Sequence, residues 1–164
     1  MNYKAVIFDF DGTVCQTGEG IRKSAAYALE SMGFPVPEDE NELNFFIGPP
    51  LLVTFQERYG ADPQTAEELV KKYRERYTNI GVYESEPYDG IEQLLQALKQ
   101  DGLKIGIASS KPKKYIETLL ERDGLIKYFD SVCGVSFTVD CESKANIIGR
   151  CMKELNSPPE ETMM

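Results

Sequence analysis

The feature that most constrains this chain is a short apolar run near its N-terminus that ends in two aspartates. The run is Ala5–Phe8, and Asp9 and Asp11 follow it. A short run rich in β-branched and aromatic residues, with no polar face, is typical of a strand buried on both sides, as in a parallel sheet. Ligands bind at the carboxyl ends of such strands, and the two-residue period of a strand places both aspartates on the same side of the chain. The sequence therefore predicts two carboxylates close together at the mouth of a sheet.

Two carboxylates at that place repel each other. At a separation of about 4 Å and an effective dielectric constant of about 20, the repulsion is roughly 4 kcal/mol. A shared proton or a cation offsets it, and Mg²⁺ binds proteins through one or two carboxylates plus substrate phosphate. We therefore expect Asp9 and Asp11 to hold Mg²⁺. Gly12 allows the backbone to turn there, and Thr13 supplies a hydroxyl and a backbone N–H.

Three other kinds of structure contain a motif of this composition. Asp and Gly favour turns, so the motif is compatible with a plain strand-to-turn junction, although an unpartnered aspartate after so apolar a strand is costly. A calcium loop of the EF-hand type fails, because Val14 and Gly20 stand where that loop needs Gly and Glu. A signalling receiver domain also gathers aspartates at strand ends.

The absence of histidine narrows the possible chemistry. None of the 164 residues is a histidine, which excludes Ser-His-Asp triads, Cys-His nucleophiles and HExxH zinc sites within this sequence. Catalysis must then use carboxylates, lysines and hydroxyls. The four cysteines contain no Cys-x-x-Cys pair, as is typical of reduced thiols: Cys15, Cys133, Cys141 and Cys151. We expect Cys133, which lies in an apolar stretch, to belong to the core.

Composition bounds the partners. The formal charge of −9 argues against nucleic-acid binding. No segment is long and apolar enough to span a bilayer, and the N-terminus lacks a signal-peptide pattern. We expect a cytoplasmic protein that binds a small molecule, with no membrane or nucleic-acid partner. Nothing in the sequence indicates an oligomeric state.

The remaining pattern indicates an α/β core interrupted by a helical insertion. Residues 17–83 carry apolar residues at helical spacing, with Gly and Pro between about four helices and no strand. From residue 84 strands and helices alternate, with strands at Leu103–Ala108 and Ser131–Val135, which implies βαβ units and a parallel sheet. The expected fold is thus a doubly wound parallel sheet formed by residues 1–16 and 84–164, with residues 17–83 as an inserted helical domain.

Two further groups lie where a parallel sheet would gather them. Ser109 ends the second strand and is followed by Ser110, and Lys144 lies at the start of a helix for which Ser143 is a candidate N-cap. Taken singly, the serine is more often a turn residue and the lysine a solvated charge. Together with Asp9 and Asp11 they form a set that suits an anion, with hydroxyl and N–H donors and one positive charge.

These motifs resemble the haloacid dehalogenase superfamily of phosphatases. The stretch Asp9–Thr13 is similar to its first motif, Ser109 to its second and Lys144 to its third. The helical insertion resembles the cap of phosphoglycolate phosphatase-like and 5′-nucleotidase-like members, and Pro87–Ile91 resembles their return from cap to core. The resemblance implies a Mg²⁺-dependent phosphatase in which Asp9 is the nucleophile. The other implied roles are a general acid and base (Asp11), a metal site (Asp9 and the Asp11 carbonyl) and phosphate contacts (Gly12, Thr13, Ser109, Ser110 and Lys144).

The sequence departs from the family pattern in two places. Gln16 stands where many relatives have an aspartate, which affects a hinge contact. The acidic fourth motif and the strand before it are absent, so that the C-terminal part of the core is expected to be missing after Met164. In the family that strand pairs with the first strand, and we expect Ala5–Phe8 to be an exposed sheet edge without it.

The substrate is not readable from the sequence. Small phosphate monoesters such as phosphoglycolate or a nucleoside monophosphate are expected, with a sugar-phosphate mutase or a truncated, non-catalytic phosphate-binding relative as alternatives. Five residues of the insertion are candidate substrate contacts, although a solvated charge or a packed aromatic is the more common role for each: Arg22, Lys23, Phe45, Phe46 and Arg58.

Overall fold

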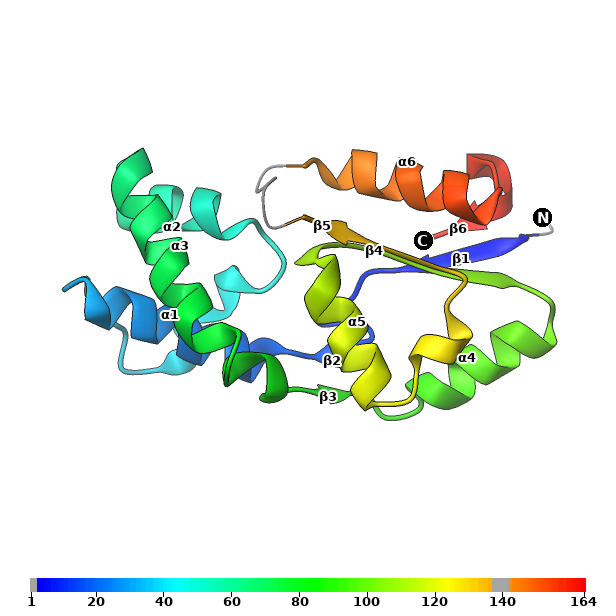
Figure 1. Cartoon of the computed structure of the whole chain (residues 1–164), viewed down its shortest axis with the longest axis horizontal. Coiled ribbons are helices and arrows are strands. Elements are labelled where there is room, and N and C mark those ends of the chain that lie inside the picture. Colours follow the sequence, from blue (N-terminus) through cyan, green and yellow to red (C-terminus); the bar gives the residue numbers. More distant parts are fainter. Residues whose placement is uncertain (1–2, 137–141) are drawn as a thin grey trace. The chain divides into compact units, whose positions relative to one another are not determined.

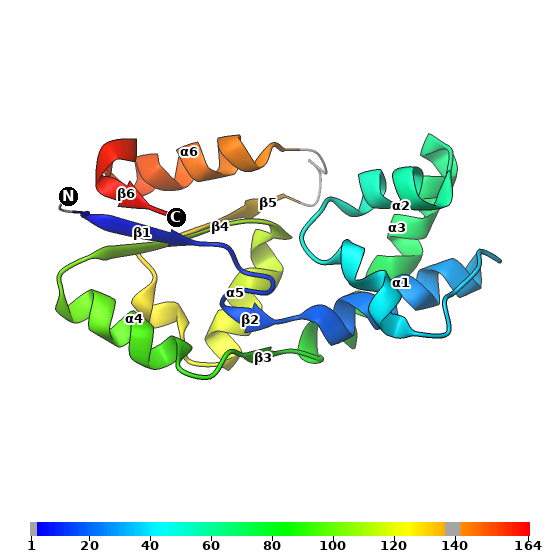
Figure 2. The same cartoon turned by 180° about the vertical axis from the view of Figure 1, so that it is seen from behind.

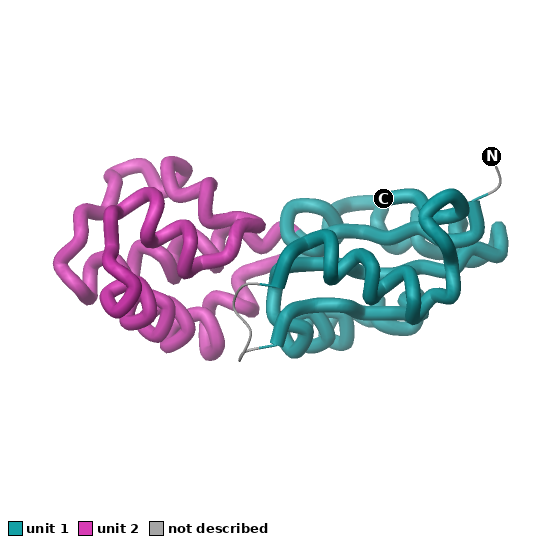
Figure 3. The backbone as a smooth tube through the Cα atoms, turned by 90° about the horizontal axis from the view of Figure 1, so that it is seen from above, with its two compact units in different colours: residues 1–15, 86–164 teal, residues 16–85 magenta. Residues whose placement is uncertain are grey.

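A computed structural model of the chain describes residues 3–136 and 142–164. The chain forms two compact units (Figure 3), residues 1–15 with 86–164 as unit 1 and residues 16–85 as unit 2. The sequence prediction placed these boundaries one residue later at the first crossing and two residues earlier at the second.

Unit 1 is built on a parallel four-stranded sheet with the strand order β5-β4-β1-β6. The strands form where apolar residues run together after a turn, and all three pairings of neighbouring strands are parallel. The strands of the sheet are β1 (Ala5–Phe8), β4 (Lys104–Pro112), β5 (Ser131–Val135) and β6 (Thr162–Met163). The prediction of an α/β fold with a parallel sheet is confirmed.

Helices cover both faces of this sheet (Figures 1 and 2). One face carries α6, and the opposite face carries α4 and α5. Their bounds are α4 (Ile91–Gln100), α5 (Lys113–Arg122) and α6 (Lys144–Leu155). Ser143 caps α6 as predicted, because its side chain accepts a hydrogen bond from Asn146 N at 3.2 Å.

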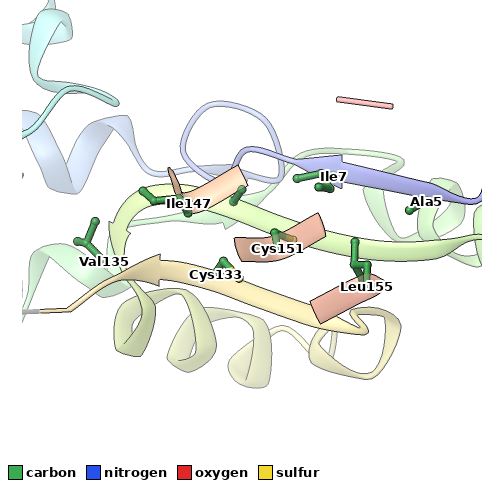
Figure 4. Close-up of a cluster of buried hydrophobic side chains, with 8 residues drawn as sticks. Ala5, Ile7, Cys133, Val135, Ile147, Cys151 and Leu155 are labelled. Atoms are coloured by element: carbon green, nitrogen blue, oxygen red, sulfur yellow. The ribbon is translucent and has the colours of Figure 1, made fainter. Parts of the chain in front are cut away.

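One hydrophobic cluster of unit 1 lies between α6 and the sheet (Figure 4). The cluster consists of apolar side chains from β1, β4, β5 and the inner face of α6. It includes Ala5, Ile7, Ala108, Cys133, Val135, Ile147, Cys151 and Leu155. Cys133 is 2% exposed, so its predicted place in the core is confirmed. Burial raises the pKa of the Cys151 thiol to about 12, which keeps that sulfur protonated and unreactive near neutral pH. Cys141 lies outside the described residues.

Two predictions about the sheet need correction. β4 does not end at Ala108 but continues to Pro112 through an irregularity in its pairing with β5. The first strand is not a fully open edge, because Thr162 and Met163 pair with Ala5 and Val6 on the side away from β4. That side is the one predicted for a further strand. Only the first half of β1 is covered in this way.

Unit 2 is helical. Its elements are α1 (Gly18–Ser31), α2 (Leu51–Tyr59), α3 (Pro63–Tyr77) and 3₁₀ helices at Glu40–Phe46 and Gly81–Tyr83. Asp62 begins α3 by accepting hydrogen bonds from the backbone N–H groups of Gln64 and Thr65, with Pro63 in the first turn, where a missing N–H costs nothing. Of the roughly four helices expected within residues 17–83, the one at Glu40–Phe46 is a 3₁₀ helix.

Two short strands, β2 (Cys15–Gln16) and β3 (Glu86–Pro87), form a separate two-stranded sheet where the chain passes between the units. Further 3₁₀ helices lie at Ile126–Tyr128 and Pro159–Glu161. None of the helices in the described part of the chain is long and apolar enough to cross a membrane.

Candidate active site

The end of β1 carries the two predicted carboxylates on either side of a buried aromatic. Phe10 is 1% exposed, and its N–H donates to Asp9 Oδ1 at 2.8 Å. The side chain of Asp9 is 38% exposed, whereas that of Asp11 is only 9% exposed. The two carboxylates therefore differ in access: a substrate can approach Asp9 more readily than Asp11.

A tight turn follows Asp11 and fixes its backbone. Gly12 has φ = +74°, a conformation that disfavours side chains other than Gly, and its N–H donates to Cys15 O at 2.9 Å. The N–H groups of Thr13, Val14 and Cys15 all lie within 3.2 Å of Phe10 O. Gly12 and Thr13 are exposed in this turn, which is where the sequence placed donors for a phosphate.

The neighbouring strand brings Ser109 to the same end of the sheet. β1 and β4 pair with Phe8 opposite Ile107, so Asp9, one residue after Phe8, and Ser109, two residues after Ile107, lie at the same end of the two strands. Ser109 is 2% exposed, and its Oγ accepts a hydrogen bond from Lys111 N at 3.3 Å. Ser110 is partly exposed beside it.

The pairing irregularity in β4 shapes this segment. Ala108 pairs with Cys133 and Pro112 with Val135, so three residues of β4 lie opposite the single residue Gly134 of β5. A Cβ atom on Gly134 would lie 2.5 Å from Lys111 O and 2.6 Å from Lys113 N. The bulged segment thus lies directly against Gly134 and can do so only because that residue has no side chain.

Lys144 reaches the first carboxylate from α6. Its Nζ lies 2.7 Å from Asp9 Oδ2, with the lysine side chain 34% exposed. Lys144 is the first residue of the helix, directly after the Ser143 cap. The structure therefore brings together two of the predicted site residues that are 135 positions apart in the chain.

A second lysine, which the sequence analysis did not select, pairs with the other carboxylate. Lys111 Nζ lies 3.0 Å from Asp11 Oδ1, and the two side chains are 4% and 9% exposed. The available signal was its position two residues after Ser109, which a continuing strand would place on the same side. The sequence analysis did not use this position, because it expected the strand to end at Ala108.

The site as described consists of two carboxylate–lysine pairs and one buried hydroxyl. The repulsion expected between Asp9 and Asp11 is offset by one lysine for each carboxylate. Across residues 3–136 and 142–164, no three or more His, Cys, Asp or Glu side chains form a group that could hold a metal ion by themselves. The donor set fits Mg²⁺ nevertheless, because this ion is bound through one or two carboxylates and completes its coordination with phosphate and water.

The candidate substrate contacts in unit 2 mostly have structural partners there. Phe46 is 2% exposed, Arg58 lies 5.1 Å from the ring centroid of Phe45, and Lys23 pairs with Glu19 at 2.6 Å. These contacts fit packing and surface roles.

Arg22 differs from the others. Its NH1 donates to the side-chain oxygen of Asn44 at 3.1 Å, while its Nε is buried without a hydrogen-bond partner in the described structure. Its partner is a neutral amide, not a carboxylate.

Comparison with known proteins identifies the family of this chain. A sequence model described as haloacid dehalogenase-like hydrolase matches residues 6–164. The chain belongs to that family. The resemblance inferred from the motifs is thereby confirmed, and the match includes both carboxylates, Ser109 and both lysines of the site.

Several relatives are similar over most of this chain. A 5′-nucleotidase of Pseudomonas aeruginosa is 38% identical over 134 residues, which is 82% of this chain and 60% of that protein. The tyrosine-protein kinase PtkA of Mycobacterium tuberculosis is 31% identical over 159 residues, covering 97% of this chain and 54% of that protein. The chain thus spans little more than half the length of these curated relatives.

Among solved structures, a predicted phosphatase from Clostridium acetobutylicum superposes with a TM-score of 0.95 at 38% identity, over 100% of this chain and 76% of the other. A putative phosphatase from Clostridium difficile gives a TM-score of 0.83 at 34% identity, over 99% of this chain and 75% of the other. The fold described here is therefore shared with proteins named as phosphatases.

Proposed function

We propose that the protein is a Mg²⁺-dependent phosphatase that hydrolyses a small organic phosphate monoester through an aspartyl-phosphate. The observation that carries this proposal is the pair formed by Asp9 and Lys144, 2.7 Å apart and both partly exposed at the carboxyl end of β1. A carboxylate in such a position can act as a covalent nucleophile. The adjacent ammonium group can neutralise the phosphoryl oxygens that approach it.

The residues of the site divide the proposed reaction between them. An Asp9 oxygen attacks phosphorus and forms the acyl-phosphate bond while the bond from phosphorus to the ester oxygen breaks. Asp11 gives its proton to that oxygen, so the alcohol leaves neutral and Asp11 becomes a carboxylate. In the second half Asp11 removes a proton from water, which attacks phosphorus and releases Asp9 and phosphate.

Charge on the transferring group needs separate stabilisation. The oxygens of the phosphoryl group would be bound by Ser109, Ser110, Lys144 and the N–H groups of Gly12 and Thr13, which act as positioned donors. Mg²⁺ held by Asp9 and the Asp11 carbonyl oxygen would supply Lewis-acid neutralisation of the phosphate. Enzymatic acceleration of phosphate-monoester hydrolysis reaches about 10²¹-fold, more than a single carboxylate supplies by itself.

Unit 2 is proposed to be the cap that selects the substrate, and phosphoglycolate-like esters or nucleoside monophosphates are the leading candidates. The names of the relatives support a range rather than one substrate. One is a 5′-nucleotidase, and another, from Caldanaerobacter subterraneus and 30% identical over 170 residues, is a putative pyrophosphatase PpaX. A screen should therefore include nucleoside monophosphates, phosphoglycolate, sugar phosphates and pyrophosphate.

Phosphate release from this panel tests the proposal directly. We expect metal-dependent release from at least one ester, and Asp9→Asn should leave less than about a tenth of the wild-type turnover, since an amide is a far poorer nucleophile. Asp89→Asn, at an exposed position of the same unit, is the matched control and should keep its activity.

Other outcomes of the screen would overturn the proposal. Phosphoryl transfer between sugar hydroxyls without net phosphate release would indicate a mutase, and transfer to a protein hydroxyl would indicate a kinase. A long-lived phospho-enzyme would indicate a receiver-like phospho-acceptor. Full turnover in Asp9→Asn would remove Asp9 from the role of nucleophile.

A further inference from the structure

The pair formed by Lys111 and Asp11 is unusual in its burial. Its side chains are 4% and 9% exposed, whereas those of Arg76 and Glu84 are 18% and 22% exposed and those of Arg122 and Asp123 are 29% and 15% exposed. Those two pairs lie nearer the surface, where an ion pair costs little to form. Burying the charged Lys111 at this point of the fold therefore costs free energy that a surface ion pair would not cost.

A contribution to the stability of the fold does not explain this buried ion pair well. Removing two charges from water costs several kcal/mol per ion, and well-packed apolar residues of the same size are often as stable as a buried ion pair. A buried pair does, however, hold its groups in one geometry. Because an ammonium group contacts Oδ1 of Asp11 at 3.0 Å, rotation of that carboxylate about its last bond would break a desolvated contact.

The backbone that carries Lys111 is itself fixed. Its N–H donates to Ser109 Oγ at 3.3 Å, and its carbonyl lies against Gly134, where a Cβ atom would come within 2.5 Å. One short bulged segment of β4 therefore carries a buried hydroxyl at one residue and, two residues later, the lysine that holds Asp11.

We propose that Lys111 is a positioning residue that aims the carboxyl group of Asp11 at the leaving oxygen and keeps it in register with the phosphate bound near Ser109. This inference rests on the proposed function, because it assigns Lys111 to the proton transfer made by Asp11. In that step Asp11, protonated on the oxygen that Lys111 does not contact, gives its proton to the ester oxygen as the bond from phosphorus to oxygen breaks, and becomes the carboxylate that pairs with Lys111. Lys111 keeps its own protons throughout and touches neither phosphate nor alcohol.

A purely structural role and a positioning role differ in their dependence on the leaving group. An alkoxide leaves only if it is protonated, so hydrolysis of an alkyl phosphate needs a well-aimed acid. A p-nitrophenolate anion is a weak base and leaves without that proton. Loss of aim should therefore harm the alkyl ester far more, whereas general loss of folded enzyme would lower both rates by the same factor.

The experiment compares kcat/KM for p-nitrophenyl phosphate and for the best alkyl phosphate of the screen, using the full chain with Mg²⁺. The ratio kcat/KM reports the first chemical step, before the phospho-enzyme is hydrolysed. For Lys111→Met we expect a fall of about 100-fold with the alkyl ester, within the range of general acid catalysis, and of less than about fivefold with the aryl ester. Lys113→Met, whose side chain is 51% exposed, is the matched control and should change neither value.

A second variant covers the case in which Lys111→Met does not fold. Lys111→Gln keeps an N–H donor and should show the same preference for the aryl ester to a smaller degree. Equal losses with both esters in a folded variant would overturn the inference while leaving the proposed function intact. Absence of hydrolysis of every ester by the wild type would overturn both.

Discussion

Lys144 Nζ lies 2.7 Å from Asp9 Oδ2, and both side chains are about one-third exposed. An ion pair with this exposure contributes little to stability, typically about 0–1 kcal/mol. Its value lies in placing a positive charge beside the carboxylate that would meet a phosphate dianion. Stability and catalysis should therefore separate cleanly when Lys144 is changed.

Lys144→Met tests that separation. We expect turnover to fall by more than about tenfold, or about 1.4 kcal/mol of transition-state stabilisation, because charge on the phosphoryl oxygens would lose its partner. The melting temperature should change little. Steady-state kinetics and thermal unfolding measure the two effects, with the exposed Lys153→Met of the same helix as control. A loss of turnover no greater than in the control would return Lys144 to the role of a surface charge.

Metal exchange tests the proposed cofactor. Turnover should require Mg²⁺, disappear on treatment with a chelator and return when the ion is added back. Ca²⁺ should inhibit, because it takes more oxygen ligands at longer distances and would engage Asp9 away from the in-line path. Activity that survives prolonged chelation would contradict the assignment of Asp9 and Asp11 to a metal site.

Local sequence pattern was sufficient for much of the fold. The apolar run before Asp9 predicts a buried strand by composition alone, and Ser143 before an apolar-periodic segment predicts the start of α6. The ends of parallel strands converge on one edge of a sheet, so the approach of Lys144 to Asp9 followed from topology. No information beyond spacing and residue type was needed for these elements.

The bulge in β4 could not be predicted in this way. Ser109-Ser110-Lys111-Pro112 has the composition of a turn, and whether the strand continues depends on Gly134 in the next strand. A contact between segments more than 20 residues apart decides it, and single-sequence periodicity carries no such information. Lys111 was missed for the same reason. The short pairing of Thr162–Met163 with β1 was missed because two residues show no period at all.

The start of β4 offers a test of stability as a function of pH. Asp130 Oδ2 accepts a hydrogen bond from Ile105 N at 2.7 Å, and both of its oxygens lie within 2.9 Å of Lys99 Nζ. Partial burial alone would raise the pKa of Asp130, but the hydrogen bonds from Lys99 and Ile105 outweigh it and hold the pKa below its usual value of 3.8. A lowered pKa means that the carboxylate stabilises the fold above the usual value and ceases to do so as the pH falls through the folded-state value.

Asp130→Asn should therefore lower the free energy of unfolding by about 0.5–1 kcal/mol near neutral pH, the range of a partly exposed ion pair. The difference from the wild type should begin to shrink as the pH falls through the usual pKa of 3.8, and it should vanish only below the lowered folded-state pKa, where the wild-type carboxyl is protonated. Urea unfolding across that range measures it, with the exposed Asp101→Asn as control. A difference that is the same at acidic and neutral pH would show that the charge of Asp130 is not the source of stability.

Gly134→Ala tests whether the bulge itself sets the geometry of the site. The new Cβ atom would lie 2.5 Å from Lys111 O and 2.6 Å from Lys113 N, and these are backbone atoms that cannot turn aside. The segment from Ser109 to Lys113 must then shift, at a cost of about 1–3 kcal/mol for an overpacked site, and Lys111 should lose its alignment with Asp11.

Gly149→Ala is the matched control, because a Cβ atom there meets nothing within 4 Å and Ala is favoured over Gly in a helix by about 1 kcal/mol. We expect Gly134→Ala to unfold at a lower temperature than the wild type and, while folded, to lose more activity toward alkyl than toward aryl phosphates. Gly149→Ala should be at least as stable as the wild type and should have unchanged kinetics. If Gly134→Ala keeps wild-type stability and the wild-type ratio of the two activities, β4 can accommodate the methyl group without moving, and the bulge does not hold Lys111 in place.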